Sequence, residues 1–438
     1  MTQLALKVLS GVDTTNQFYG KLKENIELKN VCCLSEVPSG DFVVVDSKSV
    51  IGKEGDSYDQ LCASLGEGTS VLFLDVDANC KKILGKYVGF SGEGDSVALF
   101  VKPHGKNAKK YSIFDLSNSK PSKVKSQMIS SKSDKIIEND FELNTDSKVI
   151  SKNVMDMFYG DIMEGHLTKA EDSDIPSGVE DKQWVYGEYY DYGAPEEDKW
   201  KSYQPREQDM YGRITYKVHA FKDVAVTGDF QWIYMELNGM WCTSKSGAGM
   251  NENNHDERGW SNGSIEISIP TPSDNGVNLN VYDCSPKNVN EVKSYTTSVS
   301  FEVGYDTGNF NYSESCTEDI TDWSVTLKTD NNWLFQQSSP YPGSIEDFPD
   351  DSIKYNAGKA RHEIKSLPTL STTAVDFDTM SVWFNNSVST NTIKICPNLT
   401  VKYNYEALKN EWPAWEAMFW WHYCYPSETF SIDLSQVS

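Results

Sequence analysis

The residue types that most often carry out catalysis are scattered along this chain. The six histidines are isolated, and His362-Glu363 lacks a second histidine at the spacing of a zinc-binding helix. The glycine-rich runs that begin at Gly66 and Gly92 fit neither phosphate-binding pattern and are typical of turns. The sequence therefore predicts no catalytic residues, no enzyme activity and no cofactor.

One acidic segment begins like a calcium-binding loop. In the run Asp75-Val-Asp-Ala-Asn79, the sixth position is Cys80 where such a loop needs glycine. The twelfth position is Lys86 where the loop needs glutamate. We interpret the segment as a strand end followed by a helix cap. The nine cysteines show no zinc-motif spacing either, so no metal site is predicted.

The net charge restricts the partners. A formal charge of −24 argues against nucleic acid, which is bound by clustered Lys and Arg, and against long-range attraction to anionic lipid. No stretch approaches the ~20 apolar residues of a membrane helix. Contact with a membrane would therefore need a surface or a barrel built from several chains. The first ten residues lack the pattern of a signal peptide, which leaves the export route open.

The composition changes partway along the chain. All twelve tryptophans lie at or after Trp184, which predicts a domain boundary. We expect a small α/β domain over 1–116, a flexible linker over 117–183 and a β-rich unit over 184–438 that folds without the first domain. The linker begins with a Ser/Lys-rich run without hydrophobic periodicity, where proteases are expected to cut. The candidate cleavage residues are Lys120, Lys123, Lys125, Lys132 and Lys135.

The first domain has the pattern of a mixed fold. Residues 42–46 and 71–76 are short apolar runs of the kind found in buried strands, and helical character follows from Cys80. Residues 97–101 and 111–115 are expected to form a hairpin.

The second half shows a two-residue alternation of apolar side chains at regular spacing. Clusters of Gly, Asn, Asp and Pro separate these runs. Many short strands punctuated by turns predict a β-sandwich or barrel. The alternating positions include Ile214/Tyr216/Val218, Ile265/Ile267/Ile269, Leu399/Val401/Tyr403 and Phe430/Ile432/Leu434.

One segment resembles a known functional element. Pro286-Lys-Asn288 leads into an alternating run over 294–305, and a polar tip is followed by Asn309-Phe-Asn-Tyr-Ser313. This order is similar to the stem of the leukocidin/haemolysin family of β-barrel pore-forming toxins. The flanking runs 213–241 and 398–434 resemble the early and closing strands of that family's sandwich, so the resemblance covers about 210–438.

The first domain precedes this region as the pro-domain does in Vibrio-type cytolysins. The resemblance does not extend to the lectin domains that follow the pore module there. It implies a leukocidin-like β-sandwich with a rim and a folded pre-stem at about 285–327. It also implies a secreted haemolysin-like monomer that is cleaved in the linker and assembles into a ring on a target membrane. The implied partners are lipid, further copies of the chain, and a glycan or protein receptor.

The proposed stem is long enough to cross a bilayer, because a barrel strand needs about 9–11 residues. We expect a turn at Asp306–Asn309 and a return limb from Phe310 to Leu327. The residues expected to face lipid are Tyr295, Val299, Phe301, Val303, Tyr305, Phe310 and Tyr312. Glu314 and Glu318 fall on the same face, where a carboxylate is unfavourable, whereas Glu302 falls on the other face. In the soluble monomer we expect Glu314 and Glu318 at or near solvent.

The rim of the family lies between the stem and the closing strands. Aromatic side chains favour the lipid interface, although most of those in this chain would also suit a sandwich core. The candidate rim residues are Trp333, Phe335, Tyr341, Phe348 and Trp383.

Two other classes of protein remain open. An ordinary surface hairpin would suit a sandwich that binds glycans or protein without forming a pore, and Glu314 and Glu318 favour this class. A structural or assembly protein of the same fold is the second alternative.

Overall fold

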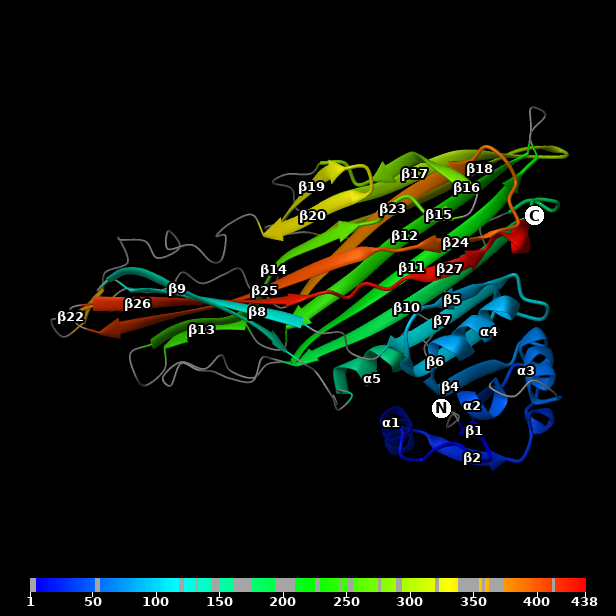
Figure 1. Ribbon diagram of the computed structural model, residues 1–438, viewed down its shortest axis with the longest axis horizontal. Helices are drawn as coiled ribbons and strands as arrows, with labels where there is room; N and C mark the ends of the chain where they lie inside the picture. Colours follow the sequence, from blue (N-terminus) through cyan, green and yellow to red (C-terminus); the bar gives the residue numbers. More distant parts are fainter. Residues whose placement is uncertain are drawn as a thin grey trace.

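The computed structural model describes residues 5–51, 56–117, 122–130, 133–143, 150, 152–160, 175–193, 209–224, 229–243, 246–250, 255–274, 277–288, 294–319, 323–337, 354–356, 359–361, 374–411 and 414–438. Over these ranges the chain is mainly β, as predicted, and a small α/β unit comes first. The helices gather at one end of the molecule, and long strands extend to the opposite end (Figure 1).

The α/β unit alternates strands and helices. Its elements are β1 (Ala5–Leu9), α1 (Gln17–Asn25), β2 (Glu27–Val31), η1 (Leu34–Glu36), β3 (Phe42–Asp46), α2 (Ser47–Val50), α3 (Asp56–Gly66), β4 (Ser70–Val76), α4 (Ala78–Val88), β5 (Phe90–Gly92), β6 (Ser96–Pro103) and β7 (Lys110–Ser117). The Asp77 carboxylate caps α4 by accepting the Cys80 N–H at 2.8 Å. The helix ends at Val88 and is followed by the cap residue Gly89, whose φ of 79° suits glycine. The interpretation of residues 75–79 as a strand end and helix cap is therefore confirmed.

The expected linker includes regular secondary structure. It contains β8 (Ser122–Ser130), β9 (Ser133–Leu143) and α5 (Lys152–Phe158). Strand β8 pairs with β9 on one side and, in antiparallel fashion, with β26 (Ala414–Cys424) on the other. These stretches were expected to be flexible linker and instead form two strands and a helix, since a Ser/Lys-rich run can still pair through its backbone.

The second half supplies the remaining strands, several of which are long. They are β10 (Asp181–Gly193), β11 (Asp209–Asp223), β12 (Phe230–Thr243), β13 (Ser246–Met250), β14 (His255–Ser268), β15 (Ser273–Asp274), β16 (Val277–Ser285), β17 (Ser294–Tyr305), β18 (Gly308–Asp319), β19 (Trp323–Thr329), β20 (Asn332–Gln337), β21 (Lys354–Asn356), β22 (Lys359–Arg361), β23 (Ala374–Asn385), β24 (Thr392–Ile395), β25 (Asn398–Glu411), β26 and β27 (Phe430–Asp433). The turn η6 (Leu434–Val437) follows β27.

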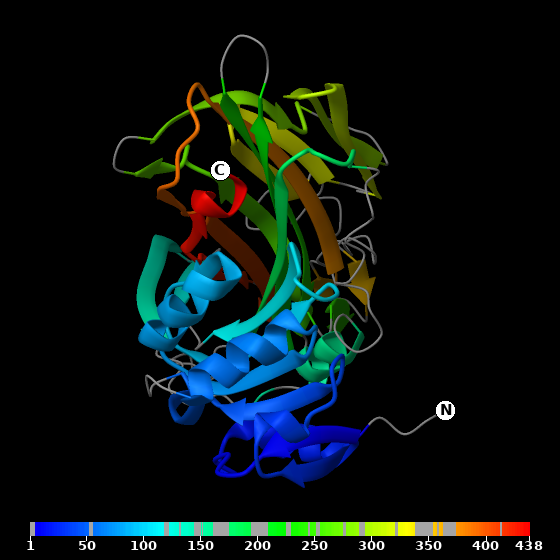
Figure 2. The same cartoon turned by 90° about the vertical axis from the view of Figure 1, so that its right-hand side faces the viewer.

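Two large sheets dominate the described part of the chain. One runs β15-β16-β23-β12-β11-β10-β7-β6-β4-β3-β1-β2, and the other runs β19-β20-β14-β25-β26-β8-β9. The larger sheet crosses the expected domain boundary, because β7 pairs in parallel with β10. The expectation that residues 184–438 fold without the first domain is therefore wrong, because the α/β unit supplies strands to the sheet of the second half. In the turned view this unit lies below the curved strands of the sandwich (Figure 2).

The largest apolar core among the described residues contains side chains of both halves. Its buried members include Val43 and Phe73 of the α/β unit together with Trp184, Ile214 and Ile265 of the second half. A second core lies between α1, α5 and the sheet and includes Phe18, Phe114 and Phe158. Burial of these apolar side chains supplies the main driving force that holds the elements together. Among the described residues, no helix is long and apolar enough to cross a membrane.

Candidate functional site

The segment that resembles a stem forms a separate hairpin. Strands β17 and β18 pair only with each other among the described residues, from Ser294–Asp319 to Tyr305–Gly308. The predicted turn lies at Asp306-Thr307, where Tyr305 pairs with Gly308. The return limb is shorter than expected and ends at Asp319. Residues 323–329 form β19, which pairs with β20 in the smaller of the two large sheets.

The hairpin lies against the outside of the larger sheet. Strand β17 alternates between exposed and buried residues from Ser294 to Val303, so the predicted two-residue pattern is confirmed. Few main-chain contacts join it to the sandwich. The Val224 N–H donates to the Gly304 carbonyl at 2.9 Å, and the Ser298 N–H donates to the Ser285 hydroxyl at 3.0 Å.

The tip half of the buried face is apolar. Val299, Phe301, Val303 and Tyr312 are each at most 3% exposed. They pack with side chains of β11, β12 and β23 in one cluster, which includes Phe221, Tyr234, Met380 and Val382. The Phe301 ring stacks on Trp232 at a centroid distance of 4.9 Å. The predicted lipid-facing residues therefore share one face, and that face is covered by the sandwich.

Charged and polar side chains lie on the same face from its middle, where Glu314 pairs with Val299, toward its base. Glu314 on β18 accepts a hydrogen bond from Lys217 Nζ on β11 at 2.7 Å and one from the Tyr312 hydroxyl at 2.8 Å. The side chains of Lys217 and Glu314 are only 14% and 19% exposed. Glu318 is also half-buried and accepts from the Cys316 thiol at 3.5 Å. Glu314 and Glu318 were expected at or near solvent; both are half-buried, and an ion pair with Lys217 accommodates Glu314 at the sheet.

Asp378 of β23 lies fully buried beneath β17. Its carboxylate accepts a short hydrogen bond from the Thr297 hydroxyl, and its backbone N–H donates to the Tyr295 hydroxyl at 2.6 Å. Burial raises the pKa of Asp378 well above its ordinary value, and the nearby charges of Glu236 and Glu318 raise it further.

A buried histidine lies on the same side of the sheet. Nε2 of His219 lies 3.1 Å from the Asp181 carboxylate, and Nδ1 lies 3.4 Å from the Tyr312 hydroxyl. The His219 ring also makes an edge contact with the Tyr312 ring at 5.4 Å. Burial lowers the pKa of His219, although Asp181 acts in the opposite direction.

The outer face of the hairpin is polar along its length. On β17 it carries Thr296, Ser298, Ser300 and Glu302, all exposed. On β18 it carries Asn309, Asn311, Ser313, Ser315 and Thr317, also exposed. Glu302 accepts a hydrogen bond from Asn309 at 2.7 Å across the two strands. The hairpin therefore has one covered face with apolar residues and one face of small polar residues in water.

The three candidate rim residues that the structure describes do not lie at a surface. Trp333, Phe335 and Trp383 are all 0% exposed and belong to the main core, so their prediction as membrane contacts is wrong for this state. Aromatic rings suit a sandwich core as well as a lipid interface, and the sequence pattern does not separate the two. Tyr341 and Phe348 lie outside the described residues.

The candidate cleavage residues are not all in one environment. Lys123 and Lys125 lie exposed on β8, and Lys135 lies on β9. Lys120 and Lys132 lie outside the described residues. The cleavage region itself stays a prediction.

The residues of the sandwich that face the hairpin were not identified from the sequence. These are Lys217 and His219 on β11, Glu236 on β12 and Asp378 on β23. A usable signal was present in β11, where Ile214, Tyr216 and Val218 form one apolar face and Phe221 lies on the other. An aromatic residue on the second face indicates that this face is also covered.

Comparisons with known proteins give partial structural matches. No protein-family model and no curated protein sequence matches the chain. A structure titled "Pore forming protein" aligns with a TM-score of 0.37 and 12% identity over 56% of this chain and 97% of its own. The Clostridium perfringens delta-toxin aligns with a TM-score of 0.35 and 11% identity, over 54% of this chain and 93% of its own. The Clostridium perfringens NetB toxin in its membrane-inserted form aligns with a TM-score of 0.30 and 12% identity, over 57% of this chain and 96% of its own.

Proposed function

We propose that this protein is a secreted pore-forming protein whose hairpin β17–β18 leaves the sandwich and inserts into a target membrane. The observation that carries the proposal is the division of the hairpin into two faces. The face now covered by the sandwich holds Val299, Phe301, Val303 and Tyr312. The exposed face is built from Ser, Thr, Asn and one Glu. A transmembrane barrel strand needs this alternation, with apolar residues toward lipid and polar residues toward the lumen.

The length of the hairpin fits a bilayer. Strands β17 and β18 are each 12 residues long. A tilted barrel strand needs about 9–11 residues to cross the hydrocarbon core. Since the hairpin forms its own two-stranded sheet, it can separate from the sandwich without breaking a strand ladder of either large sheet.

A single hairpin cannot remain in lipid by itself, because its edges would leave backbone groups unpaired. The proposal therefore requires a ring in which each subunit gives one hairpin to a shared barrel. The partners are the lipid membrane and further copies of this chain, with a glycan or protein receptor as an addition.

The base half of the buried face limits insertion. Glu314 and Glu318 would point toward lipid, where the charged form of a carboxylate is disfavoured. Proton uptake by both groups would remove this cost. We therefore propose that insertion is favoured by acid at these two residues.

Planar-bilayer recording tests the proposal. The parent protein is expected to give discrete conductance steps after addition to one side of a neutral bilayer. The variant Ser300→Lys places a positive charge on the outer face, so its pores should become more anion-selective. The variant Lys328→Ser changes an exposed residue beyond the hairpin and serves as a control with unchanged selectivity. The absence of steps under all conditions tested, including mildly acidic pH, would contradict the proposal.

A non-lytic binding module is the second candidate. The ion pair between Lys217 and Glu314 favours it, because this contact holds the hairpin to the sheet from a largely buried position. In that case the hairpin would stay docked at every pH, and the exposed polar face would be available to a glycan or protein. Retention on a glycan array without membrane leakage would support this function.

A further inference from the structure

The boundary between the α/β unit and the sandwich is built from two backbone ladders. Strand β7 pairs with β10 in parallel over six residue pairs, from Lys110–Gln183 to Asp115–Glu188. Strand β5 pairs with β27 over three residue pairs. The Trp184 indole N–H also donates to the Val88 carbonyl at the end of α4, at 3.0 Å. We call this boundary the seam.

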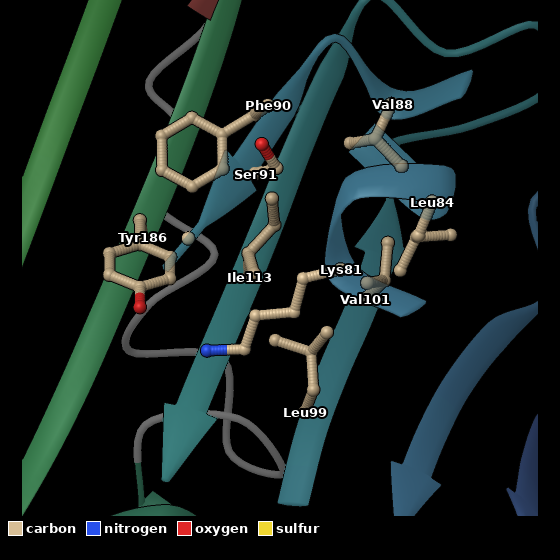
Figure 3. A pocket seen from close by; sticks show the side chains of 10 residues that line it. Lys81, Leu84, Val88, Phe90, Ser91, Leu99, Val101, Ile113 and Tyr186 are labelled. Atoms are coloured by element: carbon tan, nitrogen blue, oxygen red, sulfur yellow. The ribbon is translucent and has the colours of Figure 1, made fainter. Parts of the chain in front are cut away.

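A buried polar network crosses the seam. Lys81 Nζ on α4 lies 2.5 Å from the Asp115 carboxylate on β7, and the two side chains are 1% and 0% exposed. The Tyr186 hydroxyl on β10 donates to the same carboxylate at 2.9 Å, and the Ser96 hydroxyl makes a further short hydrogen bond to it. Figure 3 shows Lys81 extending from α4 past Ile113 toward Tyr186. Separation of the two halves would remove Tyr186 from a buried ion pair.

Aromatic packing surrounds this network. The Phe90 ring on β5 lies 5.0 Å from both the Tyr186 ring and the Phe430 ring. Tyr186 in turn stacks on Tyr216 at 5.9 Å. These rings belong to the core that the two halves share. Separation would expose them to water, which is opposed by the hydrophobic effect.

Helix α5 closes the other side of the unit. Phe158 contacts Phe18 at a ring distance of 5.0 Å and Phe114 at 4.9 Å. Val185 and Tyr189 of β10 belong to the same cluster. Both faces of strand β10 therefore pack against side chains of the α/β unit.

We infer that the α/β unit is a permanent part of the folded protein and is not released when the chain is cut between β7 and β10. The α/β unit and the sandwich bind each other across the seam. A cut in the segment after Ser117 nicks the protein and leaves both fragments bound. Loss of an N-terminal pro-domain is then not a means of activation, whether or not the hairpin forms pores.

A nicked protein tests this inference. A site-specific protease sequence is inserted between Ser119 and Lys120, and the purified full-length chain is cut to completion. Denaturing electrophoresis should show two fragments, whereas native mass spectrometry should show one species near the full 49.3 kDa plus the insert. Elution of the two fragments as separate folded species at micromolar concentration would overturn the inference.

A matched pair of variants tests the role of the network. Lys81 is buried and Lys82, its neighbour on α4, is exposed. In the nicked protein, Lys81→Met should weaken the complex of the two fragments by about 100-fold or more, because it leaves Asp115 buried without its cation. Lys82→Met should match the parent. If Lys81→Met does not fold, Tyr186→Phe gives a milder test with an expected loss of about 3- to 10-fold. Binding as tight as in the parent for every folded seam variant would show that the network does not hold the seam.

Discussion

Lys217 and Glu314 join two parts of the molecule that pair in separate sheets. Their side-chain atoms lie 2.7 Å apart, and the residues are 97 positions apart in the sequence. Lys217 also lies 4.0 Å from Glu236, so one ammonium serves two carboxylates beneath the hairpin. The hairpin is therefore held by apolar packing toward its tip and by this ion pair at its middle, where Glu314 pairs with Val299.

Removal of the Glu314 charge should loosen the hairpin. In Glu314→Gln the ion pair with Lys217 is lost, and we expect docking to weaken by about 1–2 kcal/mol because the pair is partly buried. Hydrogen exchange of amides in 294–319 should become faster by about tenfold. Glu302→Gln on the exposed outer face is the control and should leave exchange unchanged. Equal protection in both variants would contradict the assigned role of Glu314.

Asp378 should make docking weaker at high pH. Its pKa is raised while it is buried under β17, so the docked state binds the proton more tightly than a released state with an ordinary pKa near 3.8. The stability of docking is therefore fully present at low pH and is lost as pH rises through the raised pKa. Asp378→Asn should remove this loss and raise the melting temperature at pH 8 by about 2–4 °C. A lower melting temperature at pH 8 than in the parent would count against this account.

His219 should act in the opposite direction. Burial lowers its pKa below the ordinary 6.5, so the docked state favours the neutral ring. Its contribution to stability is present above about pH 6.5 and is lost as pH falls, because the released ring takes up a proton. In His219→Gln, the loss of hairpin protection between pH 7 and pH 5 should become smaller. An unchanged pH profile would show that His219 does not control docking.

The outbound strand could be predicted because its evidence is local. From Tyr295 to Val303 the side-chain period of two is visible in the sequence itself, and the same period appears as alternating burial. The end of the return strand could not be predicted in this way. Residues 323–329 continue the β pattern, but their partner β20 lies in another sheet.

The contacts that hold the hairpin depend on residues far apart in the chain. Thr297 and Asp378 are 81 positions apart, and no local pattern pairs them. The parallel pairing of β7 with β10 is of the same kind, because it joins strands separated by β8, β9 and α5. Trp333 and Trp383 illustrate the remaining difficulty: an aromatic residue suits a core or a lipid interface, and only packing decides between them.

If the protein forms pores as proposed, the hairpin must leave the sandwich, and a reversible crosslink can prevent this step. The hydrogen bond between Val224 N–H and the Gly304 carbonyl brings these two backbones close together, so Val224→Cys with Gly304→Cys should form a disulfide. Dye release from neutral liposomes is measured for the oxidised and the reduced double variant from pH 7.5 to pH 5, with each single variant under the same oxidant as a control. We predict no release when the crosslink is closed and release at the parent level after reduction. Equal release by the oxidised and reduced forms, with the crosslink confirmed by mass spectrometry, would contradict the proposal.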